Sequence, residues 1–192
     1  MNSYEYIVLN TWLANADRLY LDGRLLWLQV GGIGSSCILL WLSVEQIIKT
    51  VVFQRRIQNG EFNSSNQDAT HKKLDAWGMK IGHKIEKNLQ ALNDTYPKLL
   101  TNEEIKTLEK IYEHFNRRYV VNSSTGIAID LLHKVDAIYF KLRDLISEDL
   151  PVAFIDEIAI RRERGQQHAI EDYMKFAYLD NSSFRKRSRY RT

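Results

Sequence analysis

Hydrophobic residues recur every three or four positions along most of the chain, the spacing that lines one face of an α-helix. The alternation typical of a half-buried strand is not evident in the sequence. The predicted helices span residues 3–29, 35–59, 71–93, 101–119 and 127–146. A weaker pattern over residues 151–180 predicts one long helix or two short helices hinged at Gly165. We therefore expect an all-α fold, a bundle of five or six mostly antiparallel helices.

Several residues near the helix ends predict local interactions. Thr101 and Glu104 have the spacing of a capping box at the start of the fourth helix. Gly60 is placed to end the second helix. Within that helix Glu45 and Lys49 lie four residues apart with the acid first, the favourable order for a surface ion pair.

Other positions bear on how the helices pack. Gly78 and Gly82 lie four residues apart in the third predicted helix, a spacing that favours close packing against another helix. In the first predicted helix, Asp17 and Arg24 lie off the apolar face. The start of the second predicted helix offers Ser35 or Ser36 as a cap.

The stretch from Leu25 to Val44 has no charged residue and is long enough to span a bilayer. Its centre, Gly-Gly-Ile-Gly-Ser-Ser, favours a helix break, and Gln29 interrupts the first half. We therefore interpret it as two buried helix ends joined by a turn, with a membrane-spanning helix as the alternative. The amino-terminal residues lack the basic region of a secretory signal peptide.

Composition is that of a globular protein, with 44% hydrophobic and 27% charged residues in 192 positions. We expect a helical domain over residues 1–150, an extension over 151–180 and a tail over 181–192. The single cysteine, Cys37, excludes an internal disulfide and a Cys-rich zinc site. It fits a reducing, cytoplasmic location, and its apolar surroundings predict a buried thiol.

The net charge of +3 is concentrated in the tail. Without the tail the chain has 22 basic and 24 acidic residues. Arginine with interleaved tyrosine suits phosphate contact and base stacking, so we expect a disordered, nucleic-acid-binding tail. Solubility, anionic lipid or an acidic partner are the alternatives. The predicted binding residues are Arg185, Lys186, Arg187, Arg189, Tyr190 and Arg191.

An ordered series of short motifs runs through residues 3–148. It comprises Trp12-x3-Ala16-x3-Tyr20, an apolar run leading to Glu45-Gln46-Ile47-Ile48-Lys49, His71 with Leu74, and His114-Phe115-Asn116-Arg117-Arg118-Tyr119. In this order the chain resembles the HEPN superfamily of helical nucleotide-binding proteins. The resemblance implies a helical bundle that commonly dimerises. It implies either a metal-independent ribonuclease or a non-catalytic module that binds RNA or nucleotide or acts as an adaptor.

The ribonuclease members pair an arginine with a histidine four to six residues later, one for phosphate charge and one for proton transfer. After Arg117 and Arg118 the corresponding position is Asn122, which cannot transfer the proton. Arg117 and Arg118 therefore remain as phosphate-binding candidates. Arg162 and His168 form a second, alternative catalytic pair in the extension.

Known cofactor and metal motifs are not found in the sequence. It has no phosphate-binding P-loop and no serine-hydrolase elbow, and the scattered histidines lack metal-pair spacing. We expect no cofactor and no metal. The predicted function is a non-catalytic, dimeric RNA- or nucleotide-binding module or adaptor. The alternatives are a metal-independent endoribonuclease of toxin or antiviral type and a membrane-associated structural protein.

Overall fold

The computed structural model describes residues 3–30, 32–61, 67–116 and 130–146. This part of the chain consists of helices joined by short turns and contains no strand, which confirms the predicted all-α fold. The elements are α1 (Ser3–Leu25), the π-helical turn η1 (Leu26–Val30), α2 (Ile33–Gln58), α3 (Gln67–Ile81), α4 (Ile85–Thr95), α5 (Asn102–Asn116) and α6 (Leu131–Arg143). The predicted extension and tail lie outside the described residues.

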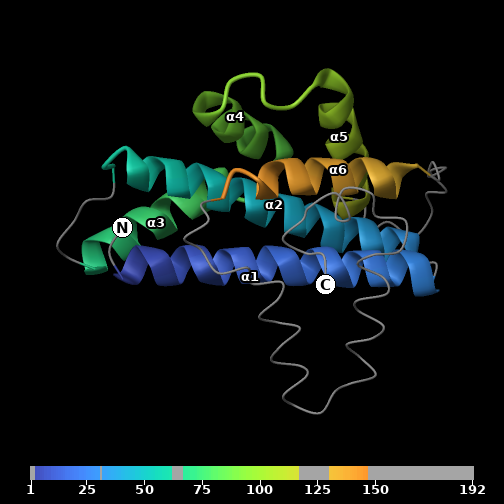
Figure 1. Cartoon of the computed structure of the whole chain (residues 1–192), viewed down its shortest axis with the longest axis horizontal. Coiled ribbons are helices and arrows are strands. Elements are labelled where there is room, and N and C mark those ends of the chain that lie inside the picture. The colour runs from blue at the N-terminus through green and yellow to red at the C-terminus, as the bar shows by residue number, and fades with distance from the viewer. Residues whose placement is uncertain (1–2, 31, 62–66, 117–129, 147–192) are drawn as a thin grey trace, which may run out of the picture.

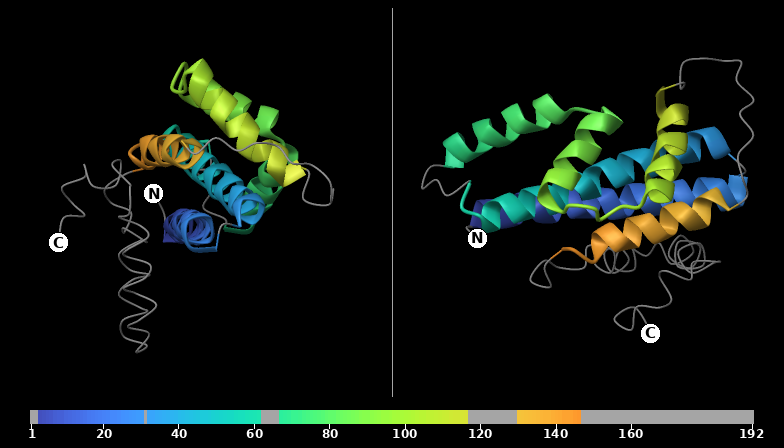
Figure 2. Two further views of the ribbon diagram at one scale, coloured as in Figure 1. Left: turned by 90° about the vertical axis from the view of Figure 1, so that its right-hand side faces the viewer. Right: turned by 90° about the horizontal axis from the view of Figure 1, so that it is seen from above.

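Helix α2 lies at the centre of the bundle and contacts α1, α4, α5 and α6 (Figure 1). Helices α1 and α2 form a long antiparallel pair, and α6 runs beside both. On the side of α2 away from α1, α4 and α5 cross the long axis (Figure 2). The α1–α2 contact is close at Gly23, because a Cβ there would lie 2.9 Å from Leu40 Cγ.

The stretch from Leu25 to Val44 is divided among the last residue of α1, η1 and α2, so it is broken near its glycines as the sequence predicts. Helix α2 begins at Ile33, so the predicted serine cap is wrong. Ser36 instead lies in the first turn, where its hydroxyl donates to the Gly23 carbonyl oxygen at 2.6 Å. Cys37 is buried as predicted, and burial raises the pKa of its thiol to about 12.

Helix α2 is the one helix of the described residues that is long and apolar enough to cross a membrane. In the bundle, 72% of its most apolar window is buried. A core helix of a soluble protein has the same length and composition, so this feature alone does not distinguish the two settings.

The carboxyl end of α2 is a Schellman turn, in which Gly60 adopts φ +78° and confirms the predicted stop.

The prediction of one continuous helix over residues 71–93 is wrong, because this part of the chain forms two helices. Helix α3 ends at Ile81 and α4 begins at Ile85. Gly82 takes φ +57°, a left-handed conformation that ends a helix. The prediction that Gly78 and Gly82 allow close packing against another helix is also wrong. A Cβ on Gly78 would meet nothing within 4 Å, and one on Gly82 would meet only the Met79 carbonyl oxygen at 3.7 Å.

A buried ion pair joins α1 to α6. The Asp136 carboxylate accepts a hydrogen bond from the Tyr20 hydroxyl at 2.5 Å and a further one from the Arg24 guanidinium. Asp136 is 1% exposed and Arg24 0%, so Arg24 is in the core although the sequence places it off the apolar face. Burial raises the pKa of Asp136, against the opposing charge of Arg24.

The same arrangement repeats in reverse. Asp17 accepts from the Tyr139 hydroxyl at 2.5 Å and from the Arg143 Nε and Nη2 at 3.2 Å each. Both halves share one sequence pattern, Asp-x2-Tyr-x3-Arg, once in α1 and once in α6. The rings of Tyr20 and Tyr139 stack between them, 4.1 Å apart and 3° from parallel. The tyrosine and the arginine of each copy therefore pair with the aspartate of the other copy, because the two helices are antiparallel.

Replacing Asp136 by leucine leaves the buried Arg24 guanidinium without its carboxylate. We expect the free energy of unfolding to fall by about 3–5 kcal/mol, the usual cost of breaking a buried ion pair. The double variant Arg24→Met, Asp136→Leu removes both charges and regains most of the loss. Urea denaturation of the parent, the two single variants and the double variant measures the coupling, and strictly additive losses would contradict the pairing.

A second, more exposed contact fastens α5 to α6. Thr101 and Glu104 form the predicted capping box, with Thr101 N donating to Glu104 Oε2 at 2.7 Å and Glu104 N donating to Thr101 Oγ1 at 3.2 Å. The same carboxylate accepts from Lys141 Nζ at 2.8 Å. Burial would raise the pKa of Glu104, but these bonds and the Lys141 charge outweigh it and hold the pKa below its usual value.

A carboxyl group whose pKa is lower in the folded than in the unfolded state stabilises the fold at pH values above its unfolded pKa. This stabilisation is lost as the pH falls through the pKa of the folded state. We therefore expect Glu104→Gln to be less stable than the parent at neutral pH. The difference should shrink on acidification below about pH 4. The control is Glu103→Gln, whose side chain is 84% exposed beside Lys106. A pH-independent difference for Glu104→Gln would contradict the expectation.

Candidate functional site

The sequence-predicted site residues lie outside the described residues. This holds for Arg117, Arg118, Arg162 and His168, and for the basic tail residues 185–191. The predicted binding and catalytic roles of these residues stay predictions. The described part of the chain offers two other features, a buried carboxylate that holds a histidine and a charged groove beside it.

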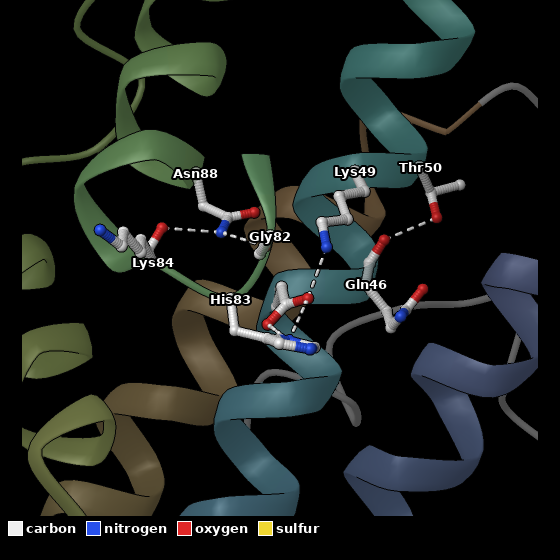
Figure 3. Close-up of polar contacts among 8 residues, drawn as sticks. Gln46, Lys49, Thr50, Gly82, His83, Lys84 and Asn88 are labelled. Carbon is white, nitrogen blue, oxygen red and sulfur yellow. Dashed lines mark hydrogen bonds and ion pairs between the residues drawn. The ribbon is translucent and has the colours of Figure 1, made fainter. Parts of the chain in front are cut away.

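The buried carboxylate belongs to Glu45, in the middle of α2. Glu45 is 0% exposed, and Lys49 one turn later donates to its Oε1 at 2.5 Å. The predicted surface pair is therefore wrong about location, because both residues are buried. The Nδ1 of His83 lies 3.0 and 2.9 Å from the two carboxylate oxygens. Figure 3 shows His83 and Lys49 converging on this carboxylate from the α3–α4 connection and from α2.

The connection that carries His83 is fixed from both sides. The Gly82 amide donates to the Gly78 carbonyl oxygen at 2.8 Å and ends α3. From α4, the fully buried Asn88 side-chain amide donates to the Gly82 and Lys84 carbonyl oxygens at 3.3 and 2.9 Å (Figure 3). The His83 ring therefore has a defined position although its side chain is 64% exposed.

A groove of about 860 Å³ lies between the end of α2, α3 and α4. Its volume is in the range of small-molecule sites. The Trp77 ring lies on its α3 side, stacked at 6.2 Å on Trp12 and at 6.4 Å on Phe53. The Arg56 guanidinium lies 5.7 Å from the Trp77 ring centroid, a cation–π distance. The groove thus combines an aromatic ring with cationic groups.

Four basic and three acidic side chains line the groove. They are Arg55, Arg56, Lys80 and Lys87, with Glu61, Glu86 and Asp94. Arg56 is paired with Glu61 at 2.7 Å, and Lys87 donates to the Lys80 carbonyl oxygen at 2.6 Å. Arg55 and Lys80 have no carboxylate partner within the described residues. These two side chains are therefore the cations available to an anionic ligand.

None of these residues belongs to a site predicted from the sequence, in which the histidines are assessed only for the spacing of metal ligands. One signal was present, because Glu45 interrupts the most apolar helix of the chain and a buried carboxylate requires a partner. The partner itself lies 38 residues away, so only the tertiary structure identifies His83. Among the described residues, no three His, Cys, Asp or Glu side chains cluster as metal ligands would.

Gly82→Ala tests whether the connection requires its left-handed residue. We expect a loss of about 1 kcal/mol in the free energy of unfolding, because alanine is strained at positive φ. The matched control is Gly78→Ala in the interior of α3, where a Cβ meets nothing. Alanine there should stabilise the protein by up to about 1 kcal/mol. Changes of the same sign at both positions would contradict the assignment.

Both features depend on how α2, α3 and α4 are placed relative to one another. The groove offers an aromatic ring and two available cations, and the connection offers an exposed imidazole held by a carboxylate. Comparisons of the chain with protein-family models, with curated proteins and with solved structures found no match.

Proposed function

We propose that this chain is a non-catalytic helical module that binds RNA or a nucleotide through the groove between α2, α3 and α4. One observation carries the proposal. Arg55 and Lys80, without carboxylate partners in the described part of the chain, line a nucleotide-sized groove beside the Trp77 ring. Arginine and lysine bind phosphate, and an aromatic face stacks on a base.

The charge of the groove limits the kind of ligand. Four cations face three carboxylates, so the groove as a whole is only weakly positive. A long duplex held by many phosphate contacts would need a broader basic surface. A single nucleotide unit, free or within a single strand, needs only one or two cations and a stacking partner. The basic tail of residues 185–191 lies outside the described residues and remains a separate predicted source of phosphate contacts.

The other predicted functions are supported by fewer observations of the described residues. The endoribonuclease alternative depends on Arg162 and His168, which lie outside the described residues. The membrane-associated alternative depends on residues 25–44, whose described part is divided among the end of α1, η1 and the first half of α2. The homodimer, the adaptor role and the cytoplasmic location remain predictions from sequence. We therefore retain the resemblance to HEPN proteins as a hypothesis about the bundle and base the binding proposal on the groove.

Lys80→Ala tests the groove. Binding of a fluorescently labelled single-stranded RNA, measured by polarisation, should weaken by up to about 5-fold in Kd, the effect of one exposed ion pair. The salt dependence, the slope of log K against log salt, should fall by about 0.7 for the lost phosphate contact. A mononucleotide should compete for the site.

Lys72→Ala is the matched control, an exposed lysine of α3 outside the groove. A variant with alanine at the five basic tail positions separates binding by the tail from binding by the groove. Equal Kd values for the Lys80 and Lys72 variants in both backgrounds would exclude the groove as the binding site.

A further inference from the structure

His83 is an exposed imidazole that is fixed at one ring nitrogen. Its Nδ1 faces both oxygens of the buried Glu45 carboxylate. A carboxylate accepts hydrogen bonds and does not donate them, so Nδ1 carries the ring hydrogen. In the neutral ring the lone pair is then on Nε2. A fixed tautomer of this kind is how a carboxylate orients a reactive histidine.

The free nitrogen is available to react. Within the described residues, Nε2 has no hydrogen-bond partner, and the side chain is largely in solvent. The Phe115 ring lies 5.9 Å from the imidazole centroid, which limits the ring's freedom on that side. His133 provides a contrast, because its Nδ1 lies 4.0 Å from Asp136, beyond hydrogen-bond distance.

Lysines flank the connection that carries the imidazole. The Lys49 ammonium donates to Oε1 of the same carboxylate, and the exposed Lys84 follows His83 directly in the sequence. Lys80 and Lys87 line the groove on either side of the connection, together with Glu86. This neighbourhood favours an anionic reactant over a neutral or cationic one.

We propose that His83 Nε2 is a phosphoryl acceptor. The donor is a molecule that carries a phosphoryl group on a good leaving group, an acyl phosphate or a phosphoramidate. The Nε2 lone pair forms a bond to phosphorus, and the donor's P–O bond, or the P–N bond of its N-protonated form, breaks. The electron pair of that bond leaves with the carboxylate or with the neutral amine, and nothing is oxidised or reduced.

Glu45 contributes to this step through charge. Attack by Nε2 places a positive charge on the ring while Nδ1 keeps its hydrogen. The buried carboxylate lies against that hydrogen and stabilises the charge as it forms. Glu45 is therefore a positioning residue, and the exposed Nε2 is the nucleophile. The proposal goes beyond ligand binding in the groove and does not depend on it, since a small donor can reach the exposed ring directly.

The test treats the full-length protein with potassium phosphoramidate at neutral pH and follows phosphorylation of each histidine by peptide mapping under alkaline conditions. His83 should react about tenfold or more faster than His133, which is similarly exposed but has no hydrogen-bonded carboxylate. Phosphorus NMR should show the Nε2 isomer, because Nδ1 is occupied. In denaturing urea the preference for His83 should disappear.

Two variants separate reactivity from structure. Glu45→Gln keeps the side-chain shape and removes the charge, so the His83 rate should fall toward that of His133. His83→Gln should abolish the fast phase and leave the slow one. Comparing His83 with His133 in the parent protein requires no variant, so the test does not depend on how the variants fold. Equal rates at the two histidines, or an unchanged His83 rate in Glu45→Gln, would overturn the proposal and leave the pair as a tie between α2 and the α3–α4 connection.

Discussion

Two buried aspartates, Asp17 and Asp136, constrain how α1 and α6 pack against each other. A carboxylate removed from water is costly unless a cation and hydrogen-bond donors meet it. Here the arginine and the tyrosine that meet each aspartate come from the opposite helix. A slip of one turn between α1 and α6 would separate both aspartates from these partners. The network therefore sets the antiparallel register on which α2 and the other helices pack.

Glu45 is a second buried carboxylate that requires partners. It is fully buried in α2 and receives Lys49 from its own helix and His83 from the connection between α3 and α4. Meeting this carboxylate draws the connection against α2 and leaves the groove between the end of α2, α3 and α4. The features proposed to bind a nucleotide and to accept a phosphoryl group thus follow from the need to satisfy one buried charge.

Local sequence signals predicted the local structure well. The capping box at Thr101 and Glu104 and the stop at Gly60 are confirmed, because each involves residues close in sequence with one favoured geometry. The split between α3 and α4 was missed, because the apolar spacing continues through the connection. The sequence predicts a packing role for Gly82, whereas in the structure this glycine supplies a positive φ at the end of α3. A glycine in a helical pattern serves either purpose, and the sequence does not distinguish them.

The sequence by itself determined the helical class, the buried position of Cys37 and the helix boundaries at Gly60 and Thr101, because periodicity and capping act over a few residues. It also contained the repeated Asp-x2-Tyr-x3-Arg pattern. The two copies lie 119 residues apart, and their side chains can pair only when α1 and α6 are antiparallel neighbours. Only the tertiary structure decided that Asp17, Arg24, Glu45 and Lys49 are buried and that His83 meets Glu45. Whether a charge is exposed or buried depends on the partners that folding brings to it, and these lie far away along the chain.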